Sequence, residues 1–204
     1  MAKCGLCGDV DGDGILYVLA VSGQRNTRPM EGIVGTVMSN FGLELACQEQ
    51  GIAFERSNVG DRYVLQKLYS KGWTLGGETS GHIIQLDKGT TGDGLLTAVS
   101  VLELMRSTGR TLAELVSGLQ IYPQSMINVP INGSVSAAIL LDDETVINAV
   151  REVESALDCN GRVVLRPSGT EPVIRVMVEG VDAVQVGMLV EQLTMAVVSS
   201  SAKY

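Results

Sequence analysis

Basic residues are scarce in this sequence. Its 15 Lys and Arg stand against 23 Asp and Glu, which gives a net charge of −8 and a pI near 4.7. Proteins that bind nucleic acid draw most of their affinity from Lys and Arg side chains that neutralise phosphates. Because this chain is acidic and has no basic cluster, we expect no nucleic-acid partner.

Cysteine is also scarce. Cys4, Cys7, Cys47 and Cys159 are scattered except for one C-x-x-C pair, whereas a zinc site needs a second pair at similar spacing. We therefore expect free thiols in a reducing cytoplasm. The sequence shows neither an apolar stretch of about 18 residues, as a membrane span requires, nor a signal peptide. These absences predict a cytoplasmic protein without a membrane partner.

The chain is, by contrast, rich in apolar residues. Its 204 residues are 45% apolar, enough to bury a sizeable core in one or two domains. Over residues 1–119, short strand-like runs alternate with longer helical ones, which predicts an α/β domain whose parallel or mixed sheet is covered by helices. Over residues 120–204, extended segments and amphipathic helices predict a small α+β domain. The clearest expected elements are strands at 32–39, 53–59 and 82–87, helices at 40–51, 61–72, 92–109, 143–158 and 182–200, and a strand pair within 161–180.

Three aspartates near the N-terminus raise the question of a metal site. Asp9, Asp11 and Asp13 follow the D-x-D-x-D-G spacing that opens an EF-hand calcium loop. That loop needs a bidentate Glu at its twelfth position, and counted from Asp9 this position is Ala20. The EF-hand interpretation therefore fails. On spacing alone, the three aspartates could still form a metal site of another kind.

The segment RPSGTEPVIR concentrates phosphate-binding groups. Gly169 would let the backbone take a turn that a side chain would obstruct. Ser168 and Thr170 offer hydroxyls beside backbone N–H groups, which would form a concave anion site. Arg166 and Arg175 flank the loop and could clamp phosphate oxygens. The alternative is a hairpin turn with two solvated arginines.

The segment LGGETSGHIIQLD carries the only histidine of the chain. If the segment is extended, Glu78, Ser80 and His82 project to one face, because side chains alternate along a strand. A carboxylate, a hydroxyl and an imidazole together suit a polyhydroxylated ligand. The alternative is a polar loop with a capped histidine. Nearby, Asp61 would cap the following helix, and Arg62 could reach a ligand phosphate.

Four stretches in this order resemble motifs of the α-D-phosphohexomutase superfamily, and within it those of the bacterial phosphoglucosamine mutases. The likeness covers residues 11 to 198 and implies the third and fourth of four domains, so that the N-terminal domains of the enzyme are missing from this chain. The motifs are GTVMSNFGLELA (35–46), VGDRYVLQKL (59–68), GGETSGHIIQLDKGTTGDG (76–94) and RPSGTEPVIRVMVEG (166–180).

The resemblance implies roles for single residues. Glu78, Ser80 and His82 match the sugar-binding loop, in which the histidine lies near the reacting centre and assists proton transfer. The implied activity interconverts glucosamine 6-phosphate and glucosamine 1-phosphate through a bisphosphorylated sugar intermediate, which supplies UDP-N-acetylglucosamine for cell-wall synthesis. The loop that anchors the phosphate not being transferred is matched by Arg166, Ser168, Gly169, Thr170 and Arg175.

Two features of the family have no counterpart in the sequence. The phosphate donor is a phosphoserine of the first domain, and the D-G-D-G-D-R magnesium loop belongs to the second. VDGDGILYVLA matches the segment downstream of that loop, so we expect Asp9, Asp11 and Asp13 to form a polar turn before a helix. We also expect Mg²⁺ to be bound only in the full enzyme, and this chain to be inactive alone.

Two alternatives to this function stay open. The chain could be a stand-alone module that binds a phosphosugar without transforming it. It could also be half of a phosphoglucomutase or phosphomannomutase, because Glu and Ser recur in the sugar loop across the superfamily. The resemblance further implies a possible homodimer.

Overall fold

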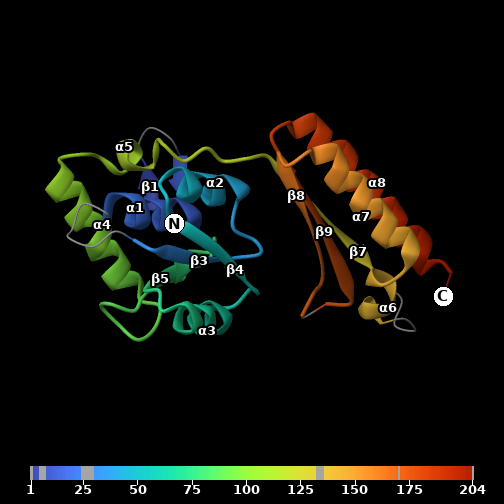
Figure 1. The fold of residues 1–204 in the computed structure, drawn as a ribbon, viewed down its shortest axis with the longest axis horizontal. Helices are drawn as coiled ribbons and strands as arrows, with labels where there is room; N and C mark the ends of the chain where they lie inside the picture. Colours follow the sequence, from blue (N-terminus) through green and yellow to red (C-terminus); the bar gives the residue numbers. More distant parts are fainter. Residues whose placement is uncertain (1, 5–7, 24–29, 132–135, 170, 204) are drawn as a thin grey trace. The chain divides into compact units, whose positions relative to one another are not determined.

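The structure, a computed structural model, forms two compact units, Met1–Ile121 and Tyr122–Tyr204 (Figure 1). We call them unit 1 and unit 2 and describe each by itself. The structure describes residues 2–4, 8–23, 30–131, 136–169 and 171–203.

Unit 1 is built on a four-stranded sheet with the order β4-β3-β5-β6. Strand β3 pairs in parallel with both β4 and β5, and β6 runs antiparallel to β5. This mixed sheet confirms the predicted α/β class. In spatial order the strands span Ala53–Ser57, Gly32–Thr36, Leu75–Gly77 and Ile83–Gln85.

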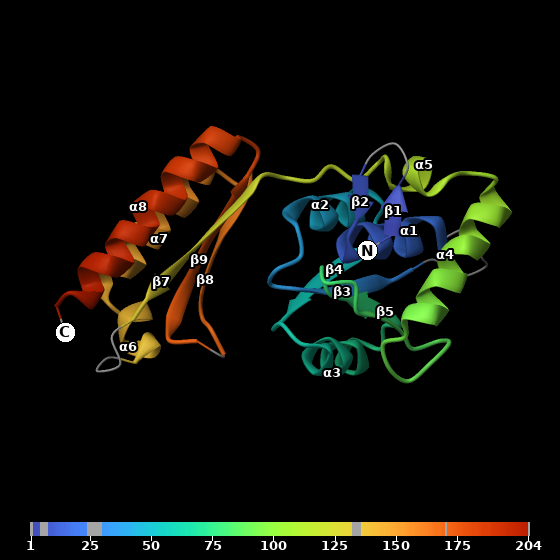
Figure 2. The ribbon, with the colours of Figure 1, turned by 180° about the vertical axis from the view of Figure 1, so that it is seen from behind.

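Helices cover both faces of this sheet (Figures 1 and 2). Helices α1 and α2 lie on one face and α3 lies on the other, while α4 packs against α1 and β6. A short helix, α5, and a two-stranded β1–β2 ribbon complete the unit. The bounds are α1 Gly12–Gly23, α2 Phe41–Glu49, α3 Asp61–Lys71, α4 Gly94–Thr108, α5 Leu112–Val116, β1 Ala2–Cys4 and β2 Gly8–Val10.

All five residues of β3 are buried, because side chains on both of its faces meet helices. Ile33 belongs to the core cluster that contains α1 and α2, whereas Val34 packs with Val64 and Leu68 of α3. The carboxyl ends of the three parallel strands consequently lie at one edge of the sheet, between the helix layers. Open α/β sheets bind ligands at this kind of edge.

The ends of α3 and α4 follow from local sequence. The Asp93 side chain accepts the N–H groups of Leu95 and Leu96, as an N-cap residue does. Gly72 and Gly109 end α3 and α4 in the left-handed conformation that glycine adopts without strain.

Unit 2 combines a three-stranded antiparallel sheet, with the order β7-β9-β8, and helices α7 and α8 on one face (Figure 2). This arrangement confirms the predicted small α+β part of the chain. Its elements are β7 Gln124–Pro130, α6 Ala137–Leu141, α7 Glu144–Leu157, β8 Gly161–Pro167, β9 Val173–Gly180 and α8 Ala183–Ser201.

Strand β9 alternates between two environments. Ile174, Val176 and Val178 belong to the core beneath α7 and α8. Because successive side chains point to opposite faces of a strand, Arg175 and Glu179 lie on the face opposite those helices. The sheet of unit 2 therefore separates an apolar face from a charged one.

Helix α8 requires one correction. Its 19 residues are long and apolar enough to cross a membrane by length and composition alone, so the expectation that no such stretch exists is wrong. Apolar residues of α8, among them Val186, Leu193 and Val197, are buried in the core of unit 2. Packing against β7 and β9 therefore accounts for part of the apolar character of α8, while Val184, Met188, Met195 and Val198 of the same helix are exposed.

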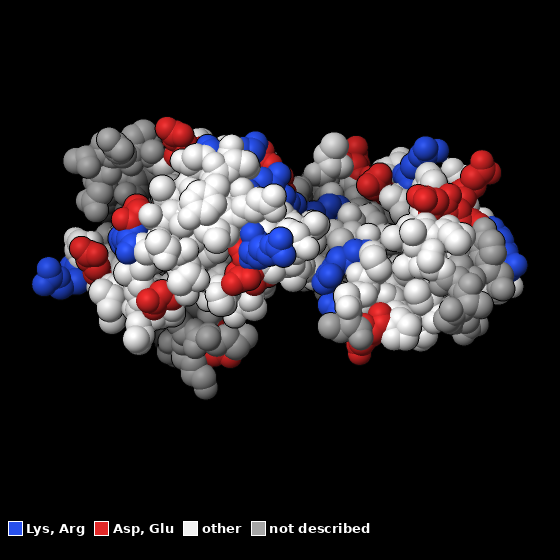
Figure 3. Space-filling model, turned by 90° about the horizontal axis from the view of Figure 1, so that it is seen from below, with Lys and Arg blue, Asp and Glu red and all other residues white. Residues whose placement is uncertain are grey.

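Charged side chains of both signs are interspersed on the surface. Figure 3 shows Lys and Arg in small groups, with Asp and Glu close by, on the face that it presents. Nucleic-acid binding uses basic residues gathered on one face. The expectation of no nucleic-acid partner remains a prediction from composition.

Candidate functional site

Unit 1 brings three loops together at the carboxyl ends of β3, β4 and β5. Arg56 of β4 donates to the carbonyl oxygens of Thr36 at 2.9 Å and Ser39 at 2.7 Å, which holds the loop after β3. The Gly60 N–H donates to Glu78 Oε1 at 2.8 Å, which ties the loop after β4 to the loop after β5. The loop that carries the predicted sugar-binding residues is thus fixed to its neighbours.

The segment from Glu78 to His82 is a tight turn. The Gly81 N–H donates to the Glu78 carbonyl at 2.9 Å, and the Glu78 N–H donates to the His82 carbonyl at 3.0 Å. The segment is not extended, so the condition under which Glu78, Ser80 and His82 would share a face is not met, because the chain reverses here to pair β5 with β6. Glu78 is half-buried at the start of the turn, and Ser80 is exposed.

His82 lies at the end of the turn with 48% of its side chain exposed, and its Nε2 is 3.7 Å from Asp61 Oδ2. A Cβ atom placed on Gly92 would lie 2.3 Å from His82 Cδ2 and 2.5 Å from Nε2. The imidazole therefore rests directly on the Gly92 backbone. It is accessible to solvent and is flanked by the loops that precede α3 and α4.

At the start of α3, Asp61 is not the cap. Gly60, with a φ of 125°, occupies the N-cap position without a side-chain cap, and Asp61 is the first helical residue. The Asp61 Oδ1 accepts the N–H of Arg62 at 2.7 Å. The expected capping role is wrong, because the turn needs a backbone conformation that favours glycine. Arg62 is exposed in the first turn, next to the aspartate that faces His82.

In unit 2, Arg166 of β8 lies directly opposite Arg175 of β9, and Asn128 of β7 lies opposite Arg175 on its other side. Residues directly opposite share a face of the sheet, with Cβ atoms about 5 Å apart. Among the described residues, the buried Nε atoms of both arginines have no hydrogen-bond partner. Glu171 comes within 3.9 Å of Arg175. Two guanidinium groups thus lie side by side with unused donors.

This arginine pair is electrostatically unfavourable without an anion. Burial, and after it the charge of Arg175, lowers the pKa of Arg166 below its ordinary value. Arginine nevertheless stays protonated in proteins, so the pair remains doubly positive. Like charges directly opposite one another destabilise a sheet. A phosphate between them would relieve the repulsion and accept several hydrogen bonds.

The hairpin tip differs from the expectation. Gly169 does not have a positive φ, and a Cβ atom there would meet no atom of the described residues within 4 Å. The prediction that a side chain would obstruct this turn is therefore wrong, because the described residues leave the space beside Gly169 open. The Ser168 N–H donates to the Val173 carbonyl at 2.9 Å, so it closes the hairpin. Thr170 lies outside the described residues.

The aspartate segment does not form a metal site in the part of the chain that the structure describes. Asp11 forms the expected polar turn before the helix, because its Oδ1 accepts the Gly14 N–H at 3.0 Å. The expectation is wrong for Asp9, which is exposed on β2, and for Asp13, which is buried within α1. No group of three His, Cys, Asp or Glu among the described residues could hold a metal ion. The residues present do not fit magnesium, and we assign no step to it in this chain.

The sequence did not predict that Asp13 is buried and hydrogen-bonded to two loops of the candidate site. It lies in the first turn of α1 and is fully buried. Its Oδ2 accepts the Asn40 N–H at 2.7 Å and the Thr79 hydroxyl at 3.1 Å. One feature of the sequence could have indicated that Asp13 is buried. It stands just before the run ILYVLA, whose residues are all buried, so a polar residue at the start of this helix is buried with them.

The two cysteines whose side chains the structure describes are both free. Cys47 is buried, and burial raises the pKa of its thiol to about 12. Cys159 is exposed. Cys7 and the side chain of Cys4 lie outside the described residues. The prediction of free thiols is therefore confirmed for Cys47 and Cys159 alone.

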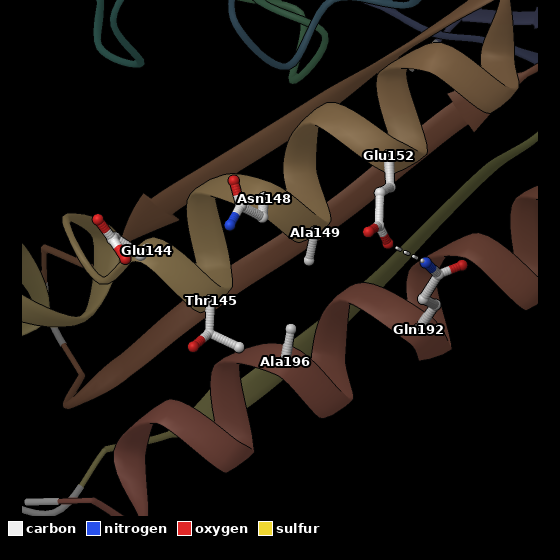
Figure 4. A pocket seen from close by; sticks show the side chains of 7 residues that line it. All are labelled: Glu144, Thr145, Asn148, Ala149, Glu152, Gln192 and Ala196. Carbon is white, nitrogen blue, oxygen red and sulfur yellow. Dashed lines mark hydrogen bonds between the residues drawn. The ribbon is translucent and has the colours of Figure 1, made fainter.

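A groove between α7 and α8 lies on the helix side of unit 2 (Figure 4). Two carboxylates, Glu144 and Glu152, line it, and Glu152 accepts the Gln192 amide at 3.2 Å. Its lining contains no Lys or Arg, so it offers a phosphate no positive charge. The arginine pair on the opposite face of the sheet is the better anion site.

Comparison with protein families matches both units. Residues 11–122 match the model of phosphoglucomutase/phosphomannomutase, alpha/beta/alpha domain III. Residues 126–196 match the model of the phosphoglucomutase/phosphomannomutase C-terminal domain.

Curated relatives cover most of this chain. Phosphoglucosamine mutase of Nitrosococcus oceani is 53% identical over 92% of this chain and 41% of its own length. Phosphoglucosamine mutase of Thioalkalivibrio sulfidiphilus is 50% identical over 92% of this chain and 42% of its own length. The chain thus spans less than half the length of the curated relatives it matches.

Solved structures share the fold. N-acetylphosphoglucosamine mutase of Aspergillus fumigatus, in complex with GlcNAc-6P and magnesium, superposes with a TM-score of 0.73. The two sequences are 18% identical, and the match covers 92% of this chain and 46% of the fungal chain.

Proposed function

Because this chain belongs to the phosphoglucomutase/phosphomannomutase family, we propose that unit 1 binds the sugar and unit 2 the phosphate of a hexosamine phosphate. Within a longer protein, these units would serve the interconversion of glucosamine 6-phosphate and glucosamine 1-phosphate through a bisphosphorylated sugar. This interconversion would supply the synthesis of UDP-N-acetylglucosamine. The name of the relatives from Nitrosococcus oceani and Thioalkalivibrio sulfidiphilus supports this choice of substrate.

The observation that carries the proposal is the arginine pair. Arg166 and Arg175 lie opposite one another, and their buried Nε atoms have no partner among the described residues. Guanidinium groups bind phosphate oxygens in pairs of parallel hydrogen bonds. The phosphate held here would be the one that is not transferred. Ser168 and Gly169 of the hairpin tip would line the same anion site, and the resemblance adds Thr170, which lies outside the described residues.

On the sugar side, the proposal depends on the turn after β5. Glu78 uses one oxygen for the Gly60 N–H, and a carboxylate has further lone pairs that can accept sugar hydroxyls. The exposed Ser80 hydroxyl would make a second contact. His82 is accessible beside them, and as the candidate catalytic residue it would exchange a proton with the reacting hydroxyl. Arg62 would contact a phosphate at the same edge.

We further propose that this chain alone does not transfer phosphate. Phosphoryl transfer needs a donor and neutralisation of the developing charge, and we assign neither a phosphoserine nor a metal ion to the described residues. A coupled mutase assay of the purified chain with glucosamine 6-phosphate should therefore give the rate of a buffer blank. Turnover above the blank would contradict this.

Calorimetric titration of glucosamine 6-phosphate into the chain tests the binding role. We expect saturable binding that Arg166→Ala abolishes and Arg151→Ala leaves unchanged. Arg151 is a suitable control because it is exposed on α7, on the other side of the sheet. Glucose 6-phosphate and mannose 6-phosphate measure the sugar preference. Equal heats for the wild type and Arg166→Ala would overturn the phosphate assignment.

A further inference from the structure

Asp13 is a carboxylate without solvent exposure at the start of α1. Its Oδ2 accepts two hydrogen bonds from distant parts of the sequence, the Asn40 N–H at 2.7 Å and the Thr79 hydroxyl at 3.1 Å. Asn40 caps α2 in the loop after β3, and Thr79 lies within the turn after β5. A single buried oxygen atom thus joins two of the three loops at the candidate sugar site.

The backbone around Asp13 supports the same junction. The Gly12 N–H donates to the Thr79 carbonyl at 2.9 Å. A Cβ atom on Gly12 would lie 2.0 Å from the Glu78 carbonyl oxygen, so α1 begins in direct contact with the turn. The Thr79 hydroxyl also lies 3.4 Å from the Met38 carbonyl oxygen. The turn that carries Glu78 and Ser80 is therefore seated on the first turn of α1.

We propose that Asp13 is a positioning residue, which sets the turn of Glu78 and Ser80 for sugar binding by holding the Thr79 hydroxyl and the Asn40 N–H. This inference rests on the proposed function of unit 1. Asp13 does not touch the ligand and acts through its two donors. Hydrogen bonds to an ionised acceptor are about twice as strong as neutral ones, and water does not replace them in a buried site.

The energetics of burial agree with this role. Burial, opposed by the hydrogen bond from Asn40, raises the pKa of Asp13 to about 6. The carboxylate therefore remains mostly charged at pH 7, at a cost in desolvation that its two donors offset in part. Without the two donors, the pKa of Asp13 would rise further and the buried carboxyl would become neutral, so its charge depends on the junction.

The test compares Asp13→Asn with Asp9→Asn, an exposed aspartate of the same segment, by amide hydrogen exchange of the ligand-free chain. We expect faster exchange at Gly12 and Gly81 in Asp13→Asn alone, because a neutral amide oxygen holds the Asn40 N–H and the Thr79 hydroxyl more weakly than a buried carboxylate, and the junction they form includes the N–H groups of Gly12 and Gly81. The Gly180 N–H, bonded to the Pro123 carbonyl in unit 2, serves as the internal reference. Unchanged exchange at Gly12 and Gly81 would overturn the proposal.

Ligand binding provides the second readout. Asp13→Asn should weaken glucosamine 6-phosphate binding about tenfold, the loss typical of one hydrogen bond to a charged group. It should leave inorganic phosphate binding to unit 2 unchanged. If the wild-type chain binds no glucosamine 6-phosphate, the proposed function fails, while amide exchange still decides whether Asp13 holds the turn.

A second pair of variants covers the case in which Asp13→Asn does not fold. Thr79→Val removes the hydroxyl and keeps the shape, and Thr79→Ser restores the hydroxyl. We expect Thr79→Val to reproduce the faster exchange at Gly81 and Thr79→Ser to rescue it. Identical exchange in these two variants would overturn the proposal.

Discussion

In unit 1, the loops of the candidate site are bonded to one another, although Asp13 Oδ1 is buried without a hydrogen-bond partner among the described residues, whereas in unit 2 two neighbouring guanidinium groups have buried Nε atoms without one. The Glu78 carboxylate accepts the Gly60 N–H, and Asp13 accepts donors from two loops. Arg166 and Arg175 instead face one another with buried Nε atoms that no described residue engages. The loops proposed to bind the sugar are therefore largely preorganised, whereas the proposed phosphate would itself supply partners to the two arginines.

Removal of both arginine charges should have the largest effect. In the double variant Arg166→Gln, Arg175→Gln, phosphate affinity should fall roughly a thousandfold, since each lost hydrogen bond to a charged group costs about 1.5–3 kcal/mol. The free energy of unfolding should stay level or rise, because the repulsion between the two charges disappears. Calorimetry and thermal melts of both proteins check this. A marked fall in melting temperature would show that the guanidinium groups are structural.

The pH dependence of the free energy of unfolding tests the buried carboxylate of unit 1, Asp13. The pKa of Asp13 is raised from 3.8 to about 6 in the folded state, so between these values the folded chain binds more protons than the unfolded chain. Protonation therefore stabilises the fold as the pH decreases, by about 2 kcal/mol between pH 7 and pH 4.

Denaturant unfolding of the wild type and Asp13→Asn at both pH values isolates this contribution, because all other titrating groups are common to the two proteins. The difference between their free energies of unfolding should change with pH. A constant difference would show that Asp13 titrates alike in the folded and unfolded chains.

The substitution Glu78→Gln should have a smaller effect. The amide oxygen can still accept the Gly60 N–H, so the turn should persist, but the charge offered to sugar hydroxyls is lost. We expect about tenfold weaker glucosamine 6-phosphate binding and unchanged binding of inorganic phosphate. Glu103→Gln, at an exposed position of α4, is the matched control. Equal losses of affinity for both ligands would contradict the proposal that unit 1 binds the sugar and unit 2 the phosphate.

The substitution Gly92→Ala should have the smallest effect. The added Cβ would meet His82 Cδ2 at 2.3 Å, and the half-exposed ring can turn away. We expect a stability loss below about 1 kcal/mol, as for substitutions near the surface, together with shifted imidazole resonances in the NMR spectrum. Unshifted resonances would mean that the ring does not rest on Gly92. Gly94→Ala is the matched control, because a Cβ atom at this exposed position meets nothing within 4 Å.

Much of the fold could be predicted because its signals are local. Asp93 and Gly109 bound the helix expected at 92–109, and alternating runs indicated the mixed α/β sheet. Strand β5 was not predicted, since two of its three residues are glycines without a strand preference. The short helices α5 and α6 contain too few residues for a periodic apolar pattern.

The geometry around the candidate site residues could not be predicted from the sequence. In an extended segment, the alternation of side chains along a strand would place Glu78, Ser80 and His82 on one face. The segment is instead a turn, because β6 returns antiparallel to β5. The bond from Thr79 to Asp13 joins residues 66 positions apart, a separation at which no local pattern operates. Such contacts are set by the packing of α1 against β5.

The pairing of β8 with β9 also determines which genetic changes the proposed phosphate site can tolerate. Arg175 lies between Ile174 and Val176, which face the core, so a one-residue deletion within β9 would exchange the two faces. The guanidinium group would then enter the core and an isoleucine would occupy the anion site. Point substitutions can alter this site gradually, but insertions and deletions within the strand would abolish both the site and the core in a single step.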